Sequence, residues 1–194
     1  MSLRTDLQDA AASLAKDVLD YSYGATISYQ NRANTALSLS AFPERESREL
    51  AQELEIDTEE TARTFYVPMQ AGLFSKVTTK ALTSNVITLT TEVAHALVTS
   101  LQIRVILDTA DSTVDGLYLV ASVPTTTTLT YAKTASNITS VAAAGVVETV
   151  IAVNDRIVFE STTYGIRRIG NAAMRTGYKL DCIRVQAQRV GMRP

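Results

Sequence analysis

The chain has 194 residues, of which 46% are hydrophobic and 20% charged, and its formal net charge is -2. This composition is typical of a globular protein with one large domain or two small ones, and it excludes a disordered chain. The weak net charge argues against a protein that grips nucleic acid over its whole surface. With one histidine and one cysteine, the chain cannot form an internal disulfide or a cysteine-based zinc site.

The first section of the chain, residues 1–73, begins with apolar residues that recur every three or four positions from Leu3 to Leu19. This spacing predicts an amphipathic helix that ends by Gly24. Strands are predicted at 25–29, 35–41 and 61–69, because these runs alternate or are rich in β-branched residues. The acidic stretch between the last two, residues 44–60, fits either a short exposed helix or a loop.

The N-terminus lacks the basic-then-apolar layout of a signal peptide, and no run approaches the ~20 apolar residues of a membrane span. We therefore expect synthesis in the cytoplasm and no membrane partner.

The middle section, residues 76–151, is crowded with Thr, Val, Ala and Ser. Short β-type runs are predicted at 86–90, 101–107, 117–123, 127–131 and 146–153, with a loop at 142–145. Strands at such regular spacing are typical of a small sandwich or barrel.

The last section, residues 154–194, predicts a three-stranded antiparallel meander with strands at 156–160, 162–169 and 178–190. Its core is too small to stand alone, so we expect it to pair with the strands of the first section. The predicted fold is mainly β with an N-terminal α-helix. A discontinuous barrel or sandwich domain, residues 1–75 plus 152–194, carries an inserted Thr-rich all-β domain, residues 76–151.

Residues able to carry catalysis are scarce. His95 is expected to be a turn histidine bonded to backbone, and Cys182 a small core residue. Asp108, Asp111 and Asp115 cluster with Gly116 between strands, which is ordinary turn chemistry, and their spacing matches no calcium-binding loop. The chain has no phosphate-binding glycine motif. We therefore expect no enzyme, no metal and no cofactor.

Charge is distributed unevenly along the chain. Residues 44–60, here called the acidic segment, hold eight acids against two bases, whereas residues 151–194 hold eight bases against three acids. The acids are Glu44, Glu46, Glu49, Glu53, Glu55, Asp57, Glu59 and Glu60. The predicted basic interface comprises Arg156, Arg167, Arg168, Arg175, Lys179, Arg184 and Arg189.

Three readings of these charges stay open. They can be two solvated surfaces, or a heterologous interface in which the acidic segment of one copy meets the basic face of the next and closes a ring. Alternatively, the basic meander is a nucleic-acid surface, although it has few aromatic residues for base stacking.

The middle section resembles a small β-barrel module that is inserted into many phage virion proteins. The resemblance is carried by Val86–Thr90, Ala94-His95-Ala96-Leu97, Leu101–Leu107, Asp115–Val120 and Thr125–Tyr131. The chain departs from the pattern at Ala96, where the module usually has Gly. The flanking sections resemble head-closure or head–tail joining proteins of tailed phages, in the strand after the N-terminal helix and in the hairpin from Asp155 to Ile166.

The resemblance implies a structural virion protein that forms a ring, as a hexamer or dodecamer, at the head–tail junction (the neck). Its neighbours would be the portal or an adaptor protein on the head side and a tail terminator or tail tube protein on the tail side. DNA would pass through the channel without sequence-specific contact, and the acidic segment would either line this channel or form the contact between subunits. Two alternatives are a tail or baseplate protein that binds the host, and a DNA-binding module that uses the Arg-rich meander.

Overall fold

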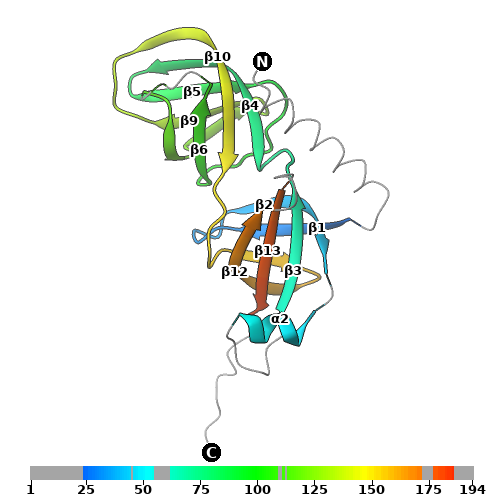
Figure 1. Ribbon diagram of the computed structural model, residues 1–194. Coiled ribbons are helices and arrows are strands. Elements are labelled where there is room, and N and C mark those ends of the chain that lie inside the picture. The colour runs from blue at the N-terminus through cyan, green and yellow to red at the C-terminus, as the bar shows by residue number, and fades with distance from the viewer. Residues whose placement is uncertain are drawn as a thin grey trace, which may run out of the picture.

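The computed structural model describes residues 24–44, 46–54, 62–108, 111, 113–171 and 177–185. These residues form two bodies of β-structure joined end to end, a closed six-stranded barrel and a seven-stranded sheet (Figure 1). The mainly β fold expected from the sequence is therefore confirmed, together with a barrel. The expected N-terminal helix lies outside the described residues.

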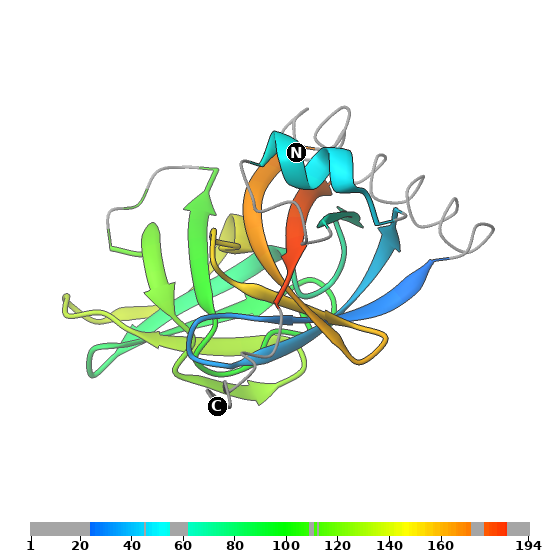
Figure 2. The same ribbon diagram turned by 90° about the horizontal axis from the view of Figure 1, so that it is seen from below.

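The barrel is built from two segments that lie far apart in the chain. The first supplies β1 (Ala25–Gln30), β2 (Ala36–Pro43) and β3 (Ala62–Pro68), and the last supplies β11 (Arg156–Phe159), β12 (Thr162–Asn171) and β13 (Gly177–Arg184). The expected meander is present, and it pairs with the first segment through β1 with β11 and through β3 with β13. Viewed from below, the blue strands of the first segment and the orange and red strands of the last wrap around one another (Figure 2).

The core of the barrel follows from strand alternation, because every second side chain points inward. On β2, for example, Leu37, Leu39 and Ala41 are buried while the residues between them are exposed. Aromatic rings fill the centre, where Phe65 meets both Phe159 and Tyr164 edge to face. One helix, α2 (Arg48–Glu53), lies at the end of the barrel away from the seven-stranded sheet (Figure 1), and Ser47 caps it by accepting the Leu50 N–H.

The seven-stranded sheet, here called the module, lies between the two barrel segments in sequence. Its order is β7-β6-β10-β4-β5-β9-β8. The strands are β4 (Phe74–Thr83), β5 (Val86–Thr91), β6 (Gln102–Leu107), β7 (Gly116–Leu119), β8 (Ser122–Thr125), β9 (Thr128–Ala132) and β10 (Ile138–Thr149). The sheet curls around its own core, in which Tyr118 stacks on Tyr131 with centroids 4.2 Å apart.

One strand of the module changes its partner midway. The sequence predicted a single strand at 117–123, but β7 pairs with β6 and β8 pairs with β9. The change falls between Val120, whose N–H bonds to Leu101, and Ala121, whose N–H bonds to Thr130. The two ends of the curled sheet are thus connected through one bent chain.

Two elements of the module were not expected from the sequence. The loop predicted at 142–145 is wrong, because these residues lie inside β10. An added Cβ on Gly145, which has φ +153°, would lie 2.4 Å from the Ile106 carbonyl oxygen, so glycine permits the close approach of β6. Strand β4 was missed because a bulge between Val77 and Thr79 interrupts its alternation.

The turn that contains His95 has an unusual backbone. His95 is fully buried, and its Nδ1 accepts the Leu97 N–H at 2.9 Å. Between them, Ala96 has φ +53°, a left-handed conformation that glycine adopts with little strain. A glycine would adopt this conformation at position 96 with less strain than alanine does.

Replacing Ala96 with Gly should therefore raise the free energy of unfolding, by about 0.5–1 kcal/mol, because it relieves the left-handed strain. Urea unfolding monitored by circular dichroism measures the change. Ala94→Gly is the matched control, since Ala94 is exposed and is not among the residues with positive φ. That variant should lower stability by a few tenths to about 1 kcal/mol through the entropy of the unfolded chain. Equal signs for the two variants would contradict the proposed strain.

Candidate functional site

The described part of the acidic segment lies on and around α2. Glu44, Glu46, Glu49 and Glu53 are exposed there, and Glu49 stands in the first turn, where an acid favours a helix. The remaining predicted acids, Glu55, Asp57, Glu59 and Glu60, lie outside the described residues. The segment thus contains the short exposed helix that the sequence allowed as one of two possibilities.

The described basic residues lie on three strands of the barrel. Arg156 is exposed on β11, and Arg167 and Arg168 are exposed on β12. On β13, Lys179 is half-buried and Arg184 is exposed. Two adjacent arginines on one strand are both exposed because a bulge follows Ile166 in the β12–β13 ladder. Arg175 and Arg189 lie outside the described residues.

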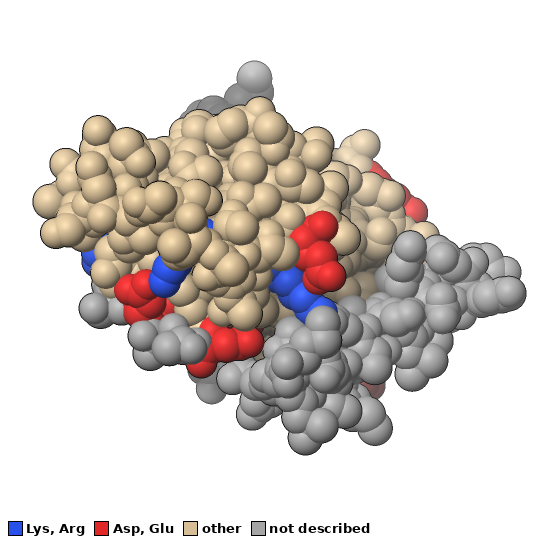
Figure 3. All heavy atoms as spheres, turned by 90° about the horizontal axis from the view of Figure 1, so that it is seen from above, with Lys and Arg blue, Asp and Glu red and all other residues tan. Residues whose placement is uncertain are grey.

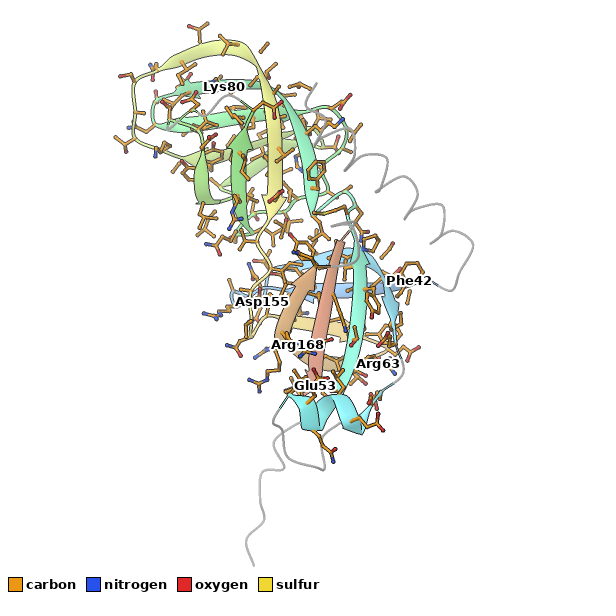
Figure 4. The ribbon with its side chains drawn as sticks, in the orientation of Figure 1. Phe42, Glu53, Arg63, Lys80, Asp155 and Arg168 are labelled. Carbon is orange, nitrogen blue, oxygen red and sulfur yellow. The ribbon has the colours of Figure 1, made fainter. Side chains whose placement is uncertain are left out.

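A polar network connects the acidic and basic regions within one chain. Arg168 donates from Nε to Asp181 at 2.6 Å and from Nη1 to Glu53 at 2.8 Å. Asp181 is only 2% exposed, and its other oxygen accepts the Thr64 hydroxyl at 2.7 Å. Arg168 and Glu53 lie together at the α2 end of the barrel (Figure 4). Arg168 therefore links α2 to β12 and β13.

This network changes the interpretation of two predicted interface residues. The sequence placed Glu53 and Arg168 on complementary surfaces, and the structure pairs them in the same subunit. Glu46 is also engaged within the chain, since it accepts the Tyr164 hydroxyl at 2.8 Å. Burial first, and then this hydrogen bond, raise the pKa of Tyr164 to about 12. Contacts between copies would have to use other charges, such as Glu49, Arg156 and Arg167.

Arg63 is a basic residue that the charge count along the sequence did not single out. It lies on β3 with its guanidinium carbon 5.2 Å from the Phe159 ring centre and 5.7 Å from that of Tyr164. Its Nε is buried and has no hydrogen-bond partner among the described residues. Strand alternation was the available signal, because it places Arg63 on the same face as the buried Phe65.

The other candidate residues are structural. Cys182 is fully buried in the barrel core, and burial raises the pKa of its thiol well above the usual range. Asp115 accepts the backbone N–H groups of Leu107 and Asp111, which is turn chemistry. Asp111 bonds to Lys80, and that contact lowers the pKa of the Asp111 carboxyl. Among the described residues, no group of three or more His, Cys, Asp and Glu is arranged to hold a metal.

A second polar cluster joins the barrel to the module. Tyr29 of β1 donates its hydroxyl to Asp155 at 2.6 Å, and the same carboxylate oxygen accepts the Ala152 N–H at 2.7 Å. Asn31 reaches across to the Ser100 carbonyl of the module at 3.0 Å. Asp155, the first residue of the hairpin that carries the phage resemblance, therefore fixes the chain as it returns from the module to the barrel.

No family model, no curated protein and no solved structure matches this chain. None of the described helices is long and apolar enough to cross a membrane.

The polar network should stabilise the barrel mainly through its buried member. Asp181→Asn should lower the free energy of unfolding by about 1–3 kcal/mol, because it weakens charged hydrogen bonds to Thr64 and Arg168. Glu53→Gln should cost less than about 1 kcal/mol, since the Glu53–Arg168 pair is exposed. Urea denaturation at neutral pH measures both. A larger effect at Glu53 than at Asp181 would show that the exposed pair dominates.

The buried tyrosines should make the fold sensitive to alkali. Burial raises the pKa of Tyr29 and of Tyr131 above the usual range, and at Tyr29 the Asp155 hydrogen bond adds to the effect. Each phenol thus stays protonated in the fold, while in the unfolded chain it ionises near the ordinary tyrosine pKa of about 10. The two phenols contribute fully to the free energy of unfolding below about pH 10, and this contribution is lost above that pH. Each tyrosine accounts for a loss of up to about 1.4 kcal/mol per pH unit.

Urea unfolding measured from pH 8 to pH 11 tests this dependence. Stability should fall above pH 10, and Tyr29→Phe should make the fall less steep. An unchanged slope in Tyr29→Phe would mean that Tyr29 does not contribute.

Proposed function

We propose that this chain is a non-enzymatic structural protein of a tailed-phage virion. It forms a ring in the head–tail connector that closes the DNA-filled head and joins it to the tail. The observation that carries the proposal is the placement of the residues that resemble head-closure proteins. Asp155, Ile157, Phe159, Tyr164 and Ile166 are all buried, and they build the barrel core and its junction with the module.

The two ends of the molecule differ in chemistry, as subunits of a directional assembly require. The α2 end of the barrel carries the exposed acids and the arginine network. The opposite end carries the module, where Lys133 is the only charged residue between Gly116 and Val147. Seen from above, the described surface of the module is mostly uncharged (Figure 3). In our proposal the barrel makes the ring, and the module projects from it.

The exposed acids also fit a channel through which DNA must slide without adhering. Like charges repel the phosphate backbone, so Glu44 and Glu49 would keep the channel wall from binding DNA. This part of the proposal fails if virions with both residues changed to Gln package and release DNA as the wild type does.

DNA binding by the barrel is the alternative function that a specific observation favours. Arg156, Arg167 and Arg184 are all exposed on the barrel. If they bind duplex DNA, affinity should fall steeply as salt rises, because each phosphate contact releases a counterion.

The connector proposal predicts binding to portal-bearing, DNA-filled capsids. Light scattering of purified protein mixed with such capsids should show bound copies in a fixed multiple of six, and the capsids should retain their DNA. Capsids that lack the portal are the control and should bind none. Failure to bind portal-bearing capsids, together with salt-sensitive binding to free duplex DNA, would replace the connector with the DNA-binding alternative.

A further inference from the structure

Arg63 has a hydrogen-bonding capacity that the described chain does not use. Its Nε is buried against protein and donates to nothing, and no hydrogen bond or ion pair of the guanidinium appears among the described residues. Buried polar groups in folded proteins are almost always paired, since burying one without a partner costs about 1–3 kcal/mol. The side chain as a whole is only partly buried. Its two terminal nitrogens are not among the described buried atoms that lack a partner, so a ligand would approach the guanidinium through them and not through Nε.

The aromatic residues around Arg63 hold the guanidinium in place. The rings of Phe159 and Tyr164 lie within 6 Å of its central carbon, and Phe65 packs edge to face on both rings from beneath. An arginine ordered in this way loses little freedom on binding a ligand. It presents a planar set of donors that matches a carboxylate.

Arg63 is not the only charged residue beside Tyr164. Two cations, Arg63 and Arg184, and one acid, Glu46, act electrostatically on the Tyr164 hydroxyl. The Glu46 carboxylate also accepts a hydrogen bond from that hydroxyl. Arg184 is the exposed cross-strand partner of Tyr164. Glu46 is negatively charged and therefore disfavours the binding of a polyanion such as DNA. One more carboxylate would balance these two described cations with two acids.

We propose that Arg63 is the anchor of a carboxylate-binding site, and that its ligand is the acidic segment of a second copy of this chain. The proposal deepens the ring proposed above and rests on it. The matching surface carries Glu49, an exposed acid on α2 that has no partner among the described residues. Unlike Glu53 and Arg168, which are paired within the chain, Glu49 and Arg63 each remain available for a contact between subunits.

The test uses the full chain and a synthetic peptide that copies residues 49–60, with blocked ends. Its binding is followed by the NMR signal of the Arg63 Nε–H group, which is identified by its loss in Arg63→Met. We expect a saturable shift of this signal with the acidic peptide. A peptide with each acid replaced by its amide should give none.

Two variants separate the site from general electrostatics. Arg63→Met should weaken peptide binding by about tenfold or more, because it removes a charged hydrogen-bond donor. Arg104→Met removes an equal charge from an exposed position on β6 of the module, outside the predicted basic interface, and should change binding less than twofold. Backbone amide spectra establish that both variants are folded, and Arg63→Lys, which keeps the charge but loses the planar donors, should bind nearly as weakly as Arg63→Met.

Three results would overturn the proposal: an unmoved Arg63 signal, equal binding of the amide peptide, or equal losses in Arg63→Met and Arg104→Met. The capsid experiment tests the ring separately. Peptide binding at Arg63 without capsid binding would support this site while removing the ring, and capsid binding without peptide binding would do the reverse.

Discussion

The pairing of β1 with β11 and of β3 with β13 is the constraint on which the rest of this structure depends. These two ladders join the first and last segments of the chain, and without them neither segment can close a barrel. They also bring the two ends of the module together, since β4 follows directly on β3 and β10 leads directly to β11. The arginine network, the Arg63 cage and the Tyr29–Asp155 junction all consist of residues from both segments.

Much of the fold could be predicted because its strands obey simple patterns. Where apolar and polar residues alternate without interruption, as in Gln102–Leu107 and Arg156–Phe159, the sequence placed strands close to their true limits. The failures occur where a bulge shifts the alternation. In β4 the bulge after Val77 hides the pattern, and in β10 the Ala142–Gly145 run has no large apolar residue to reveal a strand. Alanine and glycine are poor strand formers, so their β-structure is imposed by the neighbours.

The candidate site was less predictable, because charges counted along a chain do not reveal their partners. The acidic segment and the basic meander were both identified, yet the pairing of Glu53 with Arg168 spans 115 positions and exists only in the closed barrel. Arg63 illustrates the same limit, because the sequence does not reveal the surroundings of a single charge. As a single arginine in a strand it adds nothing to a regional charge count, and its significance comes from the rings and the missing acceptor around it.

The double connection between barrel and module has a mechanical consequence. A domain at a chain terminus is joined to the rest of the protein by one covalent connection, about which it can bend and twist freely. Here two chain connections, between β3 and β4 and between β10 and β11, cross the junction. Tyr29 and Asn31 donate hydrogen bonds there, and Asp155 accepts hydrogen bonds from Tyr29 and Ala152. A pulling or twisting force on the module is therefore shared between two parallel tethers and transmitted to opposite parts of the barrel wall, β3 and β11. We therefore expect a load on the module to reach the barrel as a torque instead of being relieved at a single flexible link.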